Sequence, residues 1–206
     1  MGIFDKLNRR TPEPDAVVLE ELRDQVLLWV LPGFNTRTEV LTLAQEFRDD
    51  DEMPVTDRQL EQLIDDVWQT RLAEQQTWTT PTDADKVAAA FAALDDAGVV
   101  ARMNFTCCQT CGVAEIDDER PTDRPSTGYV FFHQQDTERL AETPAHLYLA
   151  YGPLDPTPDD FDNQAVEIGR RVESTLRTHN LPVTWTGSTS QRISVGPLTW
   201  HRHLPA

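Results

Sequence analysis

The chain has few lysines, few cysteines and no long apolar run, and these shortages limit the classes of function that it can have. Lys6 and Lys86 are its only lysines, and 35 acidic against 18 basic residues give a formal net charge of −17. This balance argues against binding a nucleic-acid backbone, which needs clustered Lys and Arg. The longest apolar run, Val87–Leu94, is far below the roughly 18 residues that a membrane span requires. No signal-peptide pattern opens the chain, so we expect a cytoplasmic protein.

Several motifs of catalysis and nucleotide binding are absent as well. The chain has no Gly-x-Gly-x-x-Gly or Walker-type loop, which excludes nucleotide binding by those routes. It has no Gly-x-Ser-x-Gly elbow, and Ser188 and Ser190 fall in a predicted turn, so a serine nucleophile is poorly supported. The composition, 39% hydrophobic with five Trp, is that of a globular protein. The leading hypothesis is a non-enzymatic binding or interaction module. Its acidic surface is interpreted as a solvated face, and the alternative is a face that meets a basic protein partner.

The first half of the chain has the period of amphipathic helices. One apolar stripe recurs at helical spacing: Val18, Leu22, Val26 and Trp29. Pro32-Gly33 ends this helix. Thr36 and Thr56 each stand three residues before Glu or Gln, which is the capping-box pattern, and further helices follow them. A fourth helix follows Thr82 and ends at Gly98.

The second half changes to the short apolar runs of strands. Strands are predicted at Val99–Phe105, Gly128–His133 and His146–Tyr151, and a closing hairpin at Val183–Thr186 and Arg192–Val195. A long helix is predicted at Asn163–His179. The alternation of strands and helices predicts an α/β (α+β) fold with a mixed sheet of about five strands and helices packed on it.

We divide the chain into a helical subdomain, residues 1–80, and an α/β domain, residues 81–206. Trp78 is an unusual residue for a flexible linker and is expected to pack the helical part onto the sheet. The acidic run Asp49–Glu52 is expected in a loop. Met1–Leu7 is interpreted as a frayed helical turn rather than a membrane anchor.

All three cysteines, Cys107, Cys108 and Cys111, lie within five residues that follow a predicted strand and open a short helix. Three interpretations compete. The first is packing, since free Cys is among the most buried residue types. The second is a metal site, because Cys108-x2-Cys111 is half of a zinc knuckle. The third is thiol redox chemistry, which a Cys-x2-Cys after a strand also suits. On a regular helix the three cannot face one way, and we expect Cys107 and Cys111 to be buried.

A second candidate segment follows the strand at 128–133. His133 stands where α/β sheets often bind ligands, and Asp136 or Thr137 is expected to cap a helix there. His133 and Asp136 are therefore the further metal ligands proposed beside Cys108 and Cys111, with Cys107 and Gln135 as additional candidates and zinc as the possible ion. The alternative for His133 is a hydrogen-bonded structural histidine. His201 and His203 are expected to face solvent rather than a metal.

The same segments carry a family resemblance. The chain resembles an uncharacterised bacterial family, domain of unknown function 6891, over residues 15–203. The matching stretches are Trp78 with Thr82-Asp83, Phe91–Leu94, Gly98–Gly112, Phe131–Glu138, Leu181–Trp185 and Leu198–Trp200. Of these, the segments that contain the cysteines and His133 are specific to the family. It implies the boundaries of the domain and no activity.

Overall fold

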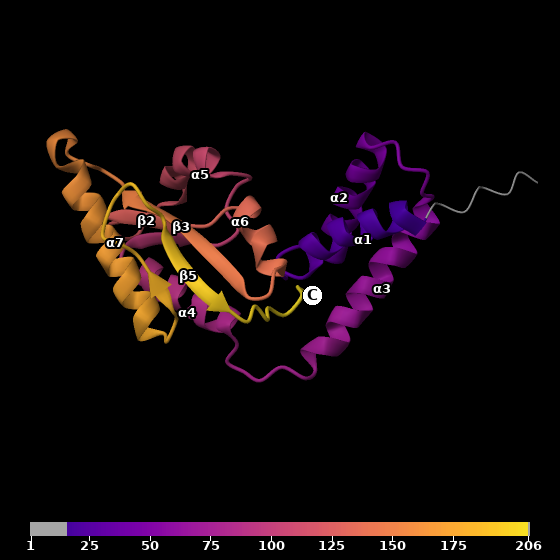
Figure 1. Cartoon of the computed structure of the whole chain (residues 1–206). Helices are drawn as coiled ribbons and strands as arrows, with labels where there is room; N and C mark the ends of the chain where they lie inside the picture. Colours follow the sequence, from indigo (N-terminus) through magenta and orange to yellow (C-terminus); the bar gives the residue numbers. More distant parts are fainter. Residues whose placement is uncertain (1–15, 206) are drawn as a thin grey trace, which may run out of the picture.

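A computed structural model of the chain describes residues 16–205 (Figure 1). Its first half consists of four helices: α1 (Ala16–Val30), α2 (Arg37–Asp50), α3 (Asp57–Gln75) and α4 (Asp83–Asp96). Thr36, Thr56 and Thr82 each close a capping box with the side chain three residues on, which fixes the first turns of α2, α3 and α4. The helices predicted from this pattern are confirmed. The expected segment Met1–Leu7 lies outside the described residues.

The second half alternates strands with helices, in the predicted order. The strands are β1 (Val99–Arg102), β2 (Gly128–Phe131), β3 (Ala145–Pro153), β4 (Val183–Thr184) and β5 (Ile193–Leu198). The helices are α5 (Gln109–Glu115), α6 (Gln134–Glu138) and α7 (Phe161–Thr178), with short 3-10 turns η1 (Ile116–Glu119), η2 (Arg139–Ala141) and η3 (Pro158–Asp160).

All five strands form one sheet in the order β1-β2-β3-β5-β4. The β1–β2 pair is parallel and the other pairs are antiparallel, so the sheet is mixed. This confirms the predicted α+β fold and the joint sheet of the first three strands. Strand β1 ends at Arg102 rather than at Phe105, because Asn104 and Thr106 adopt positive φ angles of 53° and 56° that bend the chain away.

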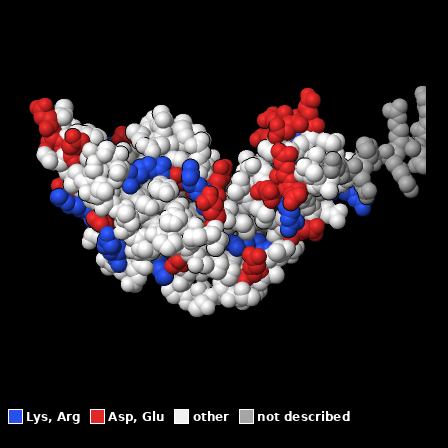
Figure 2. Space-filling view, in the orientation of Figure 1, with Lys and Arg blue, Asp and Glu red and all other residues white. Residues whose placement is uncertain are grey.

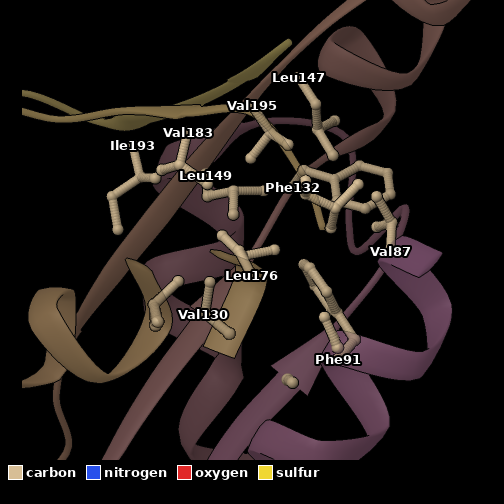
Figure 3. Packing of buried hydrophobic residues seen from close by; sticks show 14 of the residues in the cluster. Val87, Phe91, Val130, Phe132, Leu147, Leu149, Leu176, Val183, Ile193 and Val195 are labelled. Atoms are coloured by element: carbon tan, nitrogen blue, oxygen red, sulfur yellow. The ribbon is translucent and has the colours of Figure 1, made fainter. Parts of the chain in front are cut away.

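Both faces of the sheet are covered. Helices α4 and α7 pack on one face over a core that includes Val130, Phe132 and Leu149 (Figure 3). The opposite face carries a smaller hydrophobic cluster, in which Phe131 of β2 packs with Ile116 of η1. Successive residues of β2 therefore face different cores, as the pleat of a strand requires.

Helices α1, α2 and α3 surround a core of their own, to one side of the sheet (Figure 1). The turn after α1 and the segment after β5 join the two parts: Trp200 Nε1 donates to the carbonyl of Pro32 at 3.0 Å, and Arg202 Nε donates to that of Gly33 at 3.1 Å. The separate cores agree with a division near residue 80, which stays a prediction.

The acidic side chains are unevenly distributed over the surface. Figure 2 shows them gathered over the end of α2 and the turn that follows it. Asp49 and Asp50 belong to the last turn of α2, so the acidic run begins in the helix. This corrects the expectation that the whole run lies in a loop. Among residues 16–205, no helix has the length and apolar character to cross a bilayer.

Candidate functional site

The cysteine segment lies beside the carboxyl ends of the parallel strands β1 and β2. After β1, the backbone N–H of Phe105 donates to the carbonyl of Phe132 at 2.8 Å. The N–H of Gln134 then donates to the carbonyl of Thr106 at 3.1 Å. These two bonds extend the pairing of the strands and bring both predicted segments to the same edge of the sheet.

The three sulfur atoms converge. The Sγ atoms of Cys107, Cys108 and Cys111 all lie within 4.8 Å of one another, and those of Cys107 and Cys111 are 3.5 Å apart. Our expectation that they face different ways assumed a regular helix, whereas α5 begins only at Gln109. Cys108 is its N-cap, with the extended backbone angles φ −151° and ψ 171°, so the first two cysteines lie before the helix and do not follow its spacing.

The expected burial of Cys107 and Cys111 is wrong, since Cys107 is exposed and the other two are half-buried. The reason is the way α5 packs. Its one buried residue is Gly112, which lies against the ring of Phe131, and a Cβ added there would come within 2.4 Å of that ring. The close approach leaves the sulfurs at the rim, so packing of a buried corner does not explain them.

The pKa values of Cys108 and Cys111 are shifted in opposite directions. The pKa of Cys108 is lowered, chiefly because the backbone N–H of Cys111 hydrogen-bonds its sulfur. The pKa of Cys111 is raised to about 12 by hydrogen bonding and repulsion from the sulfurs of Cys107 and Cys108. The cluster thus accepts one negative charge readily and resists a second, unless a cation is present to balance it.

His133 and Asp136 form a separate, buried pair. His133 is the N-cap of α6, and its Nδ1 accepts a hydrogen bond from the backbone N–H of Asp136 at 3.3 Å. This corrects our expectation that Asp136 or Thr137 is the cap, since the ring of His133 reaches the free amides of the first turn from the position directly before the helix. Nε2 of His133 lies 3.0 Å from Oδ2 of Asp136. Burial lowers the pKa of His133, and Arg192 and Arg139 add to this effect against the attraction of Asp136.

Arg192 connects this pair to the cysteine segment. Its Nη2 donates to Oδ1 of Asp136 at 2.5 Å and to the carbonyl of Tyr148 at 2.6 Å. Its Nη1 donates to Oε1 of Gln109, the residue after Cys108, at 3.4 Å, and lies 3.3 Å from His133 Nε2. Sequence reasoning missed Arg192, because it lies far along the chain in no spacing pattern with its partners.

The structure brings the cysteines together with one another but not with the other predicted ligands. Among the described residues, the group of mutually close metal-ligating atoms holds only the three sulfurs. The ligand role of His133 and Asp136 stays a prediction. Gln135 is exposed on α6. His201 does not simply face solvent, since it stacks on Trp78.

Comparison with known proteins identifies the family. The model of the family called Domain of unknown function (DUF6891) matches residues 15–204, so the chain belongs to this family and the resemblance seen in the sequence is confirmed. No curated protein and no solved structure matches the chain. The family description assigns no activity, so a function has to be inferred from the geometry of the site.

Proposed function

We propose that this member of the DUF6891 family binds a thiophilic metal ion, Zn²⁺ first of all, through Cys107, Cys108 and Cys111. The observation that carries the proposal is the convergence of three sulfurs within 4.8 Å of one another at the rim of the sheet. Zn–S bonds of about 2.3 Å place tetrahedral sulfur ligands about 3.8 Å apart, so little movement is needed to bind the ion.

The distribution of protons supports the same proposal. A divalent cation stabilises thiolates, which removes the repulsion that raises the pKa of Cys111 to about 12. Binding therefore releases protons, and the affinity for metal should rise with pH. Cys108, whose pKa is already lowered, is the expected first ligand.

Three protein ligands leave one position of a tetrahedral ion open. Because Cys107 is exposed, this position is accessible to water, a small anion or a ligand from another protein. A three-cysteine site of this kind is compatible with the interaction module expected from the sequence, since the ion would supply the contact point.

Titration of the reduced protein with Co²⁺ tests the proposal. Thiolate-to-cobalt charge-transfer absorption should appear, saturate at one ion per chain and disappear when Zn²⁺ is added. Serine at any one of the three cysteine positions should weaken binding strongly. His133→Asn keeps a residue able to cap α6 and should bind as the wild type does. A wild-type protein with no charge-transfer band would contradict the proposal, and loss of binding in His133→Asn would restore histidine as a ligand.

A thiol-redox role is the second candidate, because the sulfurs of Cys107 and Cys111 are only 3.5 Å apart. In this role hydrogen peroxide would take two electrons and two protons from the thiols, forming one S–S bond and two waters. Peptide mapping of peroxide-treated protein would show a Cys107–Cys111 disulfide, reversible by dithiothreitol. Sulfinic or sulfonic acids without that disulfide would argue against the role.

A further inference from the structure

The first turn of α5 carries Cys111 and directly follows Cys107 and Cys108, and few side-chain hydrogen bonds hold it in place. α5 has seven residues, and at its N-cap the sulfur of Cys108, a weak acceptor, faces the backbone N–H of Cys111 in place of the oxygen that usually caps a helix. Within residues 16–205, the bond from Arg192 to Gln109 is the one side-chain hydrogen bond that joins α5 to another element. This bond reaches the residue directly after Cys108, where a small shift would move a sulfur.

Arg192 is itself fixed by a buried charge. The side chain of Asp136 is 5% exposed, and its Oδ1 accepts from Arg192. Among the described residues, Nε of Arg192 has no hydrogen-bond partner, and Oδ2 of Asp136 has only the nearby Nε2 of His133, 3.0 Å away. A buried carboxylate in this condition depends on its cation, which gives the guanidinium a strongly preferred position. The second nitrogen, Nη1, is thereby aimed at Gln109.

We infer that Arg192 is a positioning residue for the cysteine site, holding the first turn of α5 through Gln109 while anchored on Asp136. The inference rests on the proposed metal binding and assigns Asp136 and Arg192 to the surroundings of the ion rather than to its ligands. Partners of this kind orient the side chains that bind the metal, and their loss commonly weakens metal binding by about 10–100-fold.

Gln109→Leu is the sharpest test, because Gln109 is exposed and its replacement leaves the buried ion pair intact. Co²⁺ binding should weaken about tenfold, with the thermal unfolding of the metal-free protein unchanged. Gln69→Leu is the matched control, since it makes the same change at an exposed position on α3, and should bind as the wild type does. Wild-type affinity in Gln109→Leu overturns the inference.

Arg192→Lys tests whether the two side chains act as one unit. Lysine keeps a positive charge beside Asp136 but lacks the fork that reaches carboxylate and amide together. The double variant Gln109→Leu/Arg192→Lys should bind Co²⁺ no more weakly than Arg192→Lys alone. Independent, multiplying losses in the double variant would overturn the inference, because a merely structural arginine gives that result.

A metal-free measurement separates this inference from the proposed function. Diamide takes two electrons and two protons from Cys107 and Cys111 to form their disulfide, at a rate that depends on how often the sulfurs meet. Gln109→Leu should slow this reaction relative to Gln69→Leu. If the wild type binds no Co²⁺, the proposed function fails, and the diamide rate alone decides: a slower rate supports the positioning role and an equal rate overturns it.

Discussion

The indole of Trp78 stacks on the imidazole of His201, with ring centroids 4.6 Å apart and ring planes within 3° of parallel. The guanidinium of Arg71 lies 4.5 Å from the centroid of the same indole. Trp78 follows α3 and His201 follows β5, so this contact joins the helical part to the segment that leaves the sheet. This arrangement is consistent with the expectation that Trp78 packs the helical part onto the sheet.

Trp78→Ala should lower the free energy of unfolding by roughly 1–2 kcal/mol, because it removes an aromatic stack and a cation–π contact. Trp78→Phe keeps a ring and should recover most of this loss. Urea unfolding followed by far-UV circular dichroism measures both variants. Wild-type stability in Trp78→Ala would show that the stack contributes nothing.

The cysteines should contribute little to the stability of the metal-free protein. Since Cys107 is exposed and its neighbours are half-buried, serine at any of the three positions should change the free energy of unfolding by less than about 1 kcal/mol. Excess Zn²⁺ should raise the melting temperature of the wild type and leave that of each variant unchanged. An equal rise in Cys111→Ser would argue against the three-sulfur site.

Gly112→Ala should damage both the fold and the site. The added methyl group meets the ring of Phe131 and forces α5 outward, at a cost of roughly 1–3 kcal/mol in the free energy of unfolding. Because Cys111 precedes this residue, metal binding should weaken as well. Ala114→Ser, at an exposed position on the same helix, is the control. Calorimetry without and with Co²⁺ measures the melting temperature and the stabilisation by metal. If neither value changes in Gly112→Ala, the added methyl group does not displace α5.

The stability of the protein should depend on the protonation of His133. Its folded-state pKa lies below the ordinary value of about 6.5, so below that pH the unfolded chain binds a proton that the folded one does not. The free energy of unfolding should therefore fall as the pH drops from about 7.5 to about 5.5, by at most about 1.4 kcal/mol per pH unit for this one group.

His133→Asn removes the titrating group and should flatten this dependence. His201, whose pKa is also lowered by burial, contributes in the same direction, so His133→Asn/His201→Gln should flatten it further. Urea titrations at several pH values give the slopes. A slope in His133→Asn equal to that of the wild type would show that the histidine has no part in it.

The sequence predicted those features that depend on local chemistry. The capping boxes at Thr36 and Thr56 and the alternation of strands in the second half follow from neighbouring residues, and the structure confirms them. The site was harder to predict, because it depends on backbone geometry and distant partners. The start of α5 at Gln109 decides how the sulfurs face, and no pattern around the cysteines indicates Arg192.

The position of β5 has a consequence for synthesis on the ribosome. β5 lies inside the sheet between β3 and β4, yet it follows every other strand of the sheet in sequence. While the chain emerges, β1, β2 and β3 can pair, but one edge of β3 has no neighbour until residues 193–198 have been translated. Unpaired edges attract other chains, so the nascent protein is exposed to aggregation at this edge of β3 until β5 has left the ribosome and paired with it.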